Sequence, residues 1–105
     1  MPNSIVLLLT SVANEADAHI LAEGLVRERL VACVQISARG VSVYHWQGQI
    51  EMEPEYYLSI KTSAAKSDVA EAWLLEHHPY DVPEIVRLDA SASSAYASWV
   101  EEEVG

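Results

Sequence analysis

Two side chains that could ligate a metal ion flank a short, proline-bounded segment of this sequence. His78 precedes Pro79, and Glu84 follows Pro83. A helix ending near His78 and a strand starting near Glu84 would present an imidazole and a carboxylate to the same cleft. These ligand types suit Cu(II) or a similar divalent cation, whereas the thiolate of the only cysteine, Cys33, suits Cu(I). The sequence therefore offers three candidate metal ligands: His78, Glu84 and Cys33.

Each of these candidates also has a structural interpretation. A histidine at a helix C-terminus interacts favourably with the helix dipole, and Glu84 can simply form a salt bridge or a cap. Cys33 lies in the apolar run Val31–Val34, the usual setting of a small buried hydrophobic residue. A Cys33/His78 nucleophile pair would need an activated thiol, which this apolar strand does not provide. We therefore do not predict an enzyme.

A second group of polar and aromatic residues suits a ligand pocket or a subunit interface. Strand alternation places Tyr44 and Trp46 on one side of the chain and His45 on the other. Lys61 and Arg87 are two of only six Lys and Arg residues, so they could anchor an anion, although pairing with a carboxylate is the commoner role. The complete group is Tyr44, His45, Trp46, Lys61, Tyr80 and Arg87.

Hydrophobic periodicity predicts the elements that position these residues. Asn14 is suited to cap the first helix, Gln47-Gly48 to form a hairpin turn, and Pro54 to mark a strand edge or bulge. The second helix begins at or near Ser67 and must end before Pro79. The expected order is a strand at 5–9, a helix at 14–30, a strand at 31–36, a long hairpin at 41–62, a helix from about 67 to 76, a strand at 84–88 and a short C-terminal helix.

This β-α-β-β-α-β order predicts an α+β, ferredoxin-like sandwich with both helices on one face of an antiparallel sheet. The strand at 5–9 has apolar side chains on both of its faces, so the sheet face opposite the two helices must also be buried. One short C-terminal helix is too small to cover it. Arms of about ten residues in the hairpin also exceed the neighbouring strands and leave an unpaired edge. Both features predict homo-oligomerisation.

Composition bounds the class of protein. A chain of 105 residues and 11.6 kDa fits a single domain over residues 1–105. A net charge of −10 disfavours nucleic acid and anionic membrane surfaces as partners. A single cysteine allows no internal disulfide, and Met1-Pro2-Asn3-Ser4 lacks the basic region of a signal peptide, so a cytoplasmic location is expected.

Several strings in the sequence resemble the CutA divalent-cation-tolerance family. The resemblance extends over roughly residues 4–100, and its most specific part runs from His78 to Ile85. The matching strings are Ala32-Cys33-Val34, Val43-Tyr44-His45-Trp46-Gln47-Gly48-Gln49-Ile50-Glu51, Lys61-Thr62 and His78-Pro79-Tyr80-Asp81-Val82-Pro83-Glu84-Ile85.

The resemblance implies a ferredoxin-like homotrimer involved in tolerance of copper and other divalent cations, with copper binding proposed and no enzymatic activity. Some relatives carry a further cysteine where this sequence has Leu9. The alternative function is a trimeric small-ligand-binding signalling or scaffold module without a specific metal site.

Overall fold

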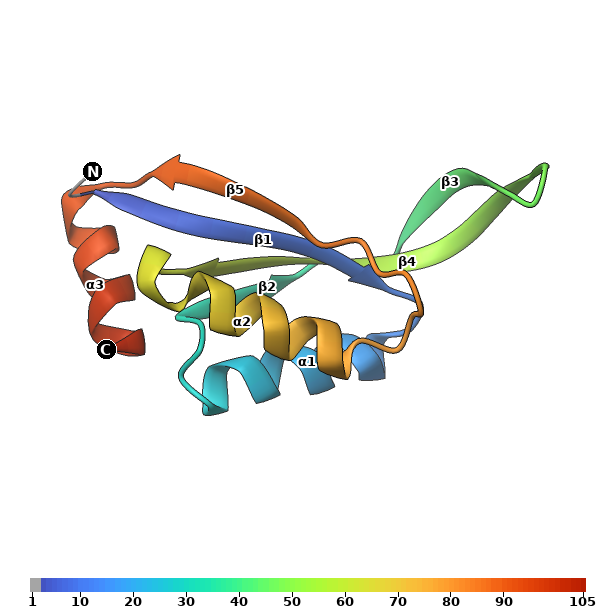
Figure 1. Cartoon of the computed structure of the whole chain (residues 1–105). Coiled ribbons are helices and arrows are strands. Elements are labelled where there is room, and N and C mark those ends of the chain that lie inside the picture. The colour runs from blue at the N-terminus through green and yellow to red at the C-terminus, as the bar shows by residue number, and fades with distance from the viewer. Residues whose placement is uncertain (1–2) are drawn as a thin grey trace.

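A computed structural model describes residues 3–105. Met1 and Pro2, the first half of the segment in which no signal peptide is expected, lie outside the described residues. An antiparallel sheet is covered on one face by two helices, and a two-stranded ribbon extends from one end (Figure 1). The molecule measures 45 × 24 × 23 Å. The elements are β1 Ser4–Val12, α1 Glu15–Arg27, β2 Cys33–Ile36, β3 Gly40–Trp46, β4 Gln49–Thr62, α2 Ala64–His77, β5 Val86–Ser91 and α3 Ser94–Val104.

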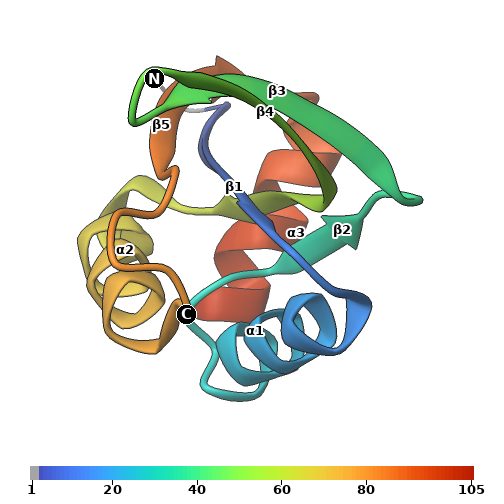
Figure 2. The same ribbon diagram turned by 90° about the vertical axis from the view of Figure 1, so that its right-hand side faces the viewer.

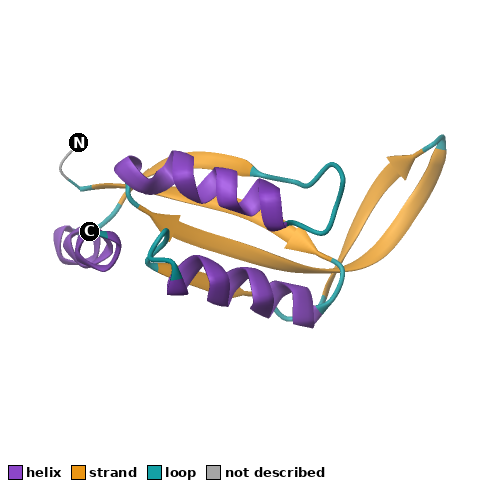
Figure 3. Cartoon of the chain, turned by 60° about the horizontal axis from the view of Figure 1, so that its bottom comes forward, coloured by secondary structure: helices purple, strands orange, loops and turns teal. Residues whose placement is uncertain are grey.

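The sheet order β2-β4-β1-β5 confirms the predicted ferredoxin-like α+β sandwich. Helices α1 and α2 pack side by side on the same face of the sheet (Figure 3). Val6 and Leu8 of β1 and Ile60 of β4 point toward these helices and are almost completely buried. The tip of Trp73 packs so closely on α1 that a Cβ at Gly24 would lie 2.5 Å from it.

Strand β4 is longer than the predicted hairpin arm and has two parts. Residues 49–55 pair only with β3 and form the ribbon, whereas residues 56–62 pair with β1, and residues 58–61 of this part also pair with β2. The predicted hairpin over 41–62 is therefore confined to residues 40–55. Pro54 lies in the two-stranded part, where one edge of β4 is free and a strand proline is tolerated.

The second face of the sheet is covered only at one end. Ile5, on the opposite side of β1 from Val6, packs with Ala97 and Val100 of α3. Beyond α3 this face, which we call the open sheet face, continues through Leu7, Leu9, Val86 and Leu88, since these residues share the parity of Ile5 across β1 and β5. Figure 1 shows α3 at one end of β1 and β5, with both strands extending past it, and Figure 2, viewed from the ribbon end, shows α3 behind β1.

Local signals set most element boundaries. At the start of α1, the Asn14 side chain accepts a hydrogen bond from the backbone N–H of Asp17. In the ribbon turn, Gln47 and Gly48 have positive φ values of 52° and 79°. Helix α2 begins at Ala64 rather than near Ser67, because Ser63 caps it by accepting the Lys66 amide. No helix of residues 3–105 has the length and apolar character needed to cross a membrane.

Candidate functional site

A buried polar network joins three segments that are distant in sequence. His78 follows α2, Thr10 and Ser11 lie near the end of β1, and Glu55 lies where the ribbon leaves the body of the sheet. His78 and Glu55 are each only 8% exposed. Tyr80 completes the network from the connection between α2 and β5. We call this cluster the Glu55–His78 network, and it contains two of the predicted site residues, His78 and Tyr80.

Hydrogen bonds occupy both ring nitrogens of His78. Nδ1 accepts the Tyr80 backbone N–H at 3.1 Å, which places the ring proton on Nε2. Nε2 donates toward the Ser11 carbonyl oxygen at 3.0 Å and lies equally close to the Thr10 hydroxyl. The neutral ring therefore has no free lone pair, and a metal ion at His78 would have to displace one of these partners.

The Glu55 carboxylate is held by two hydroxyl donors. Ser11 Oγ donates to Oε1 at 3.1 Å, and Tyr80 Oη donates to Oε2 at 2.7 Å. Each carboxylate oxygen thus has a partner despite its burial, as a buried charge requires. These contacts tie the base of the ribbon to β1 and to the connection that carries the predicted cleft.

Burial and charge act on the titratable members of this network. Burial lowers the pKa of His78, although the Ser11 carbonyl and the charges of Glu55 and Asp17 partly oppose this shift. Burial, followed by the hydrogen bond to Glu55, raises the pKa of Tyr80 well above its ordinary value. The network is therefore arranged to keep His78 neutral and the Tyr80 hydroxyl protonated.

The three predicted metal ligands lie apart. Glu84 is exposed in the segment leading to β5, whereas half-buried Cys33 lies opposite Lys61 and beside Tyr96 of α3. Within residues 3–105, no cluster of three or more His, Cys, Asp or Glu side chains is placed to hold a metal ion. A metal site on His78, Glu84 and Cys33 stays a prediction, and one chain alone does not bring the three together.

The β3–β4 ribbon has two chemically different faces. The apolar ribbon face carries Val41, Val43, His45, Ile50, Met52 and Pro54. The other face carries Tyr44 and Trp46 opposite Glu51 and Gln49, with Glu53 alongside. Partial burial, followed by the charges of Glu53, Glu51 and Glu55, raises the pKa of Tyr44. The predicted placement of His45 on the opposite side from Tyr44 and Trp46 agrees with the register.

The two predicted cationic anchors have partners within the chain. Lys61 lies on the open sheet face, where Nζ donates to the side-chain oxygen of Gln35. Arg87 Nη1 donates to Asp68 at 2.8 Å, and Nη2 donates to the Ser67 hydroxyl. The hydrogen bond to Asp68 raises the pKa of Arg87. Arg87 therefore links β5 to the first half of α2, the commoner role that the sequence had left open.

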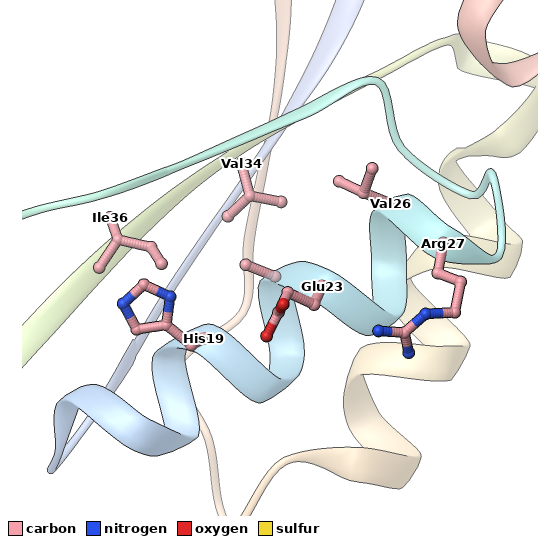
Figure 4. Close-up of a pocket in the computed structure, with 7 residues that line it drawn as sticks. His19, Glu23, Val26, Arg27, Val34 and Ile36 are labelled. Atoms are coloured by element: carbon pink, nitrogen blue, oxygen red, sulfur yellow. The ribbon is translucent and has the colours of Figure 1, made fainter.

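The described residues also form two shallow hollows. One, of about 430 Å³, lies between α1 and β2, where His19, Glu23 and Arg27 border apolar side chains that include Val34 and Ile36 (Figure 4). The other, of about 510 Å³, lies at the base of the apolar ribbon face and is lined by Arg39, Gly40, Val41, Met52 and Pro54. Neither hollow is lined by any of the predicted site residues.

Sequence reasoning missed Glu55 and its donor Ser11, and also Thr10, which contacts His78. From the sequence, carboxylates of this kind were considered only as partners for the two predicted cationic anchors. Ser11 is 44 residues away from Glu55 in the chain, so no local spacing indicates the contact. The available signal was a polar Thr-Ser pair ending an otherwise apolar strand.

Comparisons with known proteins agree with the whole architecture. Residues 6–103 match the family described as CutA1 divalent ion tolerance protein. The divalent-cation tolerance protein CutA of Thermus thermophilus is 37% identical over 100 residues, covering 94% of this chain and 97% of that protein.

Solved structures give the same result. CutA from Synechococcus elongatus superposes with a TM-score of 0.93 at 39% identity, covering 98% of this chain and 92% of that one. CutA from Xylella fastidiosa gives 0.92 at 35% identity, covering 96% and 98%. With a family match that spans nearly the whole chain, this protein belongs to the CutA1 divalent ion tolerance family.

Proposed function

We propose that the protein is a cytoplasmic homotrimer that takes part in tolerance to divalent metal ions and binds copper or a similar cation. The observation that supports assembly into a trimer is the exposure of large apolar side chains in two places. On the ribbon, Val43 is 62% and Met52 70% exposed, and on the open sheet face Val86 is 42% and Leu88 45% exposed. Surfaces of this kind mark interaction sites.

The two surfaces suit a ring of identical chains. They lie on opposite sides of the continuous strand β4, since residues 50 and 52 have the parity opposite to residues 59 and 61. Among the described residues that pair between β2, β4, β1 and β5, Lys61 is the one charged side chain on the open sheet face, and the paired residues of the apolar ribbon face include no Asp, Glu, Lys or Arg. Two different patches that cover each other form a head-to-tail interface, which gives a ring when the rotation between neighbouring chains closes, as in the trimer proposed here.

A pair of charge variants on the ribbon tests the assembly. Val43→Glu adds a carboxylate to the centre of the apolar ribbon face, whereas Gln49→Glu adds the same charge to the opposite face. We expect Val43→Glu to be monomeric in sedimentation velocity experiments and Gln49→Glu to remain trimeric. Equal assembly of both variants would contradict this role for the apolar ribbon face.

Cation binding is supported by the family relationship, by the net charge of −10 and by the exposed Glu84 carboxylate. Native mass spectrometry during a Cu(II) titration at moderate salt tests it. We expect the trimer to take up three ions, one per equivalent site, before weaker adducts appear, and Glu84→Gln to lose this discrete step. A continuous distribution of adducts would indicate attraction by surface charge alone.

The second candidate function is a trimeric small-ligand-binding signalling or scaffold module without a specific metal site. The internal hydrogen bonds to both ring nitrogens of His78 favour it over direct ligation by that ring. It predicts that small anions raise the melting temperature without metal and that Lys61→Ala removes the effect. No stabilisation by any anion in a broad screen would exclude the ligand-binding form of this candidate.

A further inference from the structure

His45 occupies an unusual position for a titratable side chain. It lies on the apolar ribbon face directly opposite Ile50, with Val43 on its own strand and Met52 diagonally across. Among the strand residues of this face, it is the only group that can gain a charge near neutral pH. His45 is exposed in the single chain.

We propose that His45 is an acid-sensitive switch in the assembly of this protein, holding the chains together when its imidazole is neutral and releasing them when it is protonated. The proposal rests on the proposed homotrimer, in which the apolar ribbon face is covered by a second copy. Covering this face would transfer His45 from water into surroundings formed by Val43, Ile50 and Met52.

The charged groups around His45 do not offset the cost of burying an imidazolium. Within residues 3–105, the strand paired with β3 at this position is β4, and its carboxylates Glu51 and Glu53 point to the other face, as does Tyr44 on β3 itself. In the proposed assembly the covering surface is the open sheet face of a second copy, where the charged strand residue is Lys61, a cation that does not stabilise an imidazolium.

The direction of the pH effect follows from proton linkage. An imidazole in water can take up a proton as the solution becomes acidic, whereas one buried among apolar groups resists protonation. The dissociated chain therefore binds more protons than the assembled one, so acid favours dissociation. Once the dissociated chain is protonated, each buried imidazole weakens assembly by up to about tenfold per further pH unit, and three in a trimer weaken it by up to about a thousandfold.

Subunit exchange measured by native mass spectrometry provides the test. Unlabelled and ¹⁵N-labelled trimers are mixed at pH 7.5, 6.5 and 5.5, and the appearance of mixed trimers reports the dissociation rate. We expect exchange to be at least tenfold faster at pH 5.5 than at pH 7.5, because affinity changes act mainly on dissociation. Circular dichroism at each pH verifies that the chain remains folded.

Two histidine variants separate His45 from other titrating groups. His45→Gln should show nearly the same exchange rate at all three pH values, whatever its absolute rate, because the comparison uses the slope. His19→Gln, which changes an exposed histidine on α1, should keep the full pH dependence.

Three results would overturn the proposal in distinguishable ways. Equal exchange rates at pH 7.5 and 5.5 in the unmodified trimer would reject the switch and leave the trimer intact. An undiminished pH dependence in His45→Gln would assign the effect to another group. A monomer at every pH would remove the proposed assembly and the switch together.

Discussion

The body of the domain and its ribbon differ in which side chains they bury: the body buries a polar network, whereas the ribbon exposes large apolar side chains. In the body, His78 and Glu55 are buried, and both ring nitrogens of His78 and both carboxylate oxygens of Glu55 have hydrogen-bond partners inside the chain. In the ribbon, Val43 and Met52 are more than half exposed and nothing in the chain covers them among the described residues. The body thus satisfies its buried polar groups within one chain, whereas the ribbon, like the open sheet face, leaves large apolar side chains exposed, which is the basis for the proposed contact with a second copy.

The largest effect should come from the core of the body. Leu8 is completely buried between the sheet and the helices, so Leu8→Ala removes apolar burial and leaves a cavity. We expect a loss of about 3 kcal/mol in the free energy of unfolding, measured by urea denaturation.

The matched ribbon variant is Met52→Ala. It should change the unfolding midpoint only through assembly, so its effect should depend on chain concentration, whereas that of Leu8→Ala should appear at every concentration. Equal, concentration-independent losses for both variants would contradict the distinction between body and ribbon.

An intermediate effect should follow from removing one hydroxyl of the network. Tyr80→Phe takes away the donor 2.7 Å from Glu55 and leaves that buried carboxylate with Ser11 as its remaining donor. We expect a loss of about 2 kcal/mol in denaturant unfolding, within the range for hydrogen bonds to charged groups. Tyr44→Phe, the same change on the ribbon, should cost less than about 0.5 kcal/mol. The assignment fails if the two tyrosine variants are equally stable.

The smallest effect is the pH dependence contributed by His78. Because its pKa is lowered in the folded chain, the unfolded chain binds the additional proton as the pH falls through about 6.5. The stabilisation by neutral His78 is present above pH 6.5 and is lost below it, by at most about 1.4 kcal/mol per pH unit.

Urea unfolding between pH 5 and 8 measures this slope. A His78→Gln variant should have a shallower slope over this range, whereas His45→Gln should keep the slope when unfolding is followed from the dissociated chain, in which His45 is exposed. An unchanged slope in His78→Gln would show that another group titrates.

The sequence predicts the local features of this fold well. The Asn14 cap and the Gln47-Gly48 turn depend on residues within a few positions, and both were correctly predicted. Boundaries set by tertiary pairing were less accurate. The last strand begins at Val86 rather than at Glu84, because its pairing with β1 runs only from Val86 to Ser91.

The candidate site was only partly predictable. The sequence singled out His78 as a candidate metal ligand, which stays a prediction, and gave no sign that its ring bonds to Thr10 and Ser11, about 67 residues away in the chain. Long-range hydrogen bonds of this kind leave no periodic pattern in a sequence. In contrast, the two faces of the ribbon were readable from strict alternation between Tyr44, His45 and Trp46.

The central claim is that the exposed surfaces of the ribbon and the open sheet face serve to assemble three copies of this chain. The most direct measurement is the mass of the unmodified protein by native mass spectrometry at pH 7.5 over a dilution series. We predict a single species of about 35 kDa, three times the 11.6 kDa of the chain. A species with the mass of one chain at micromolar concentration would contradict this account.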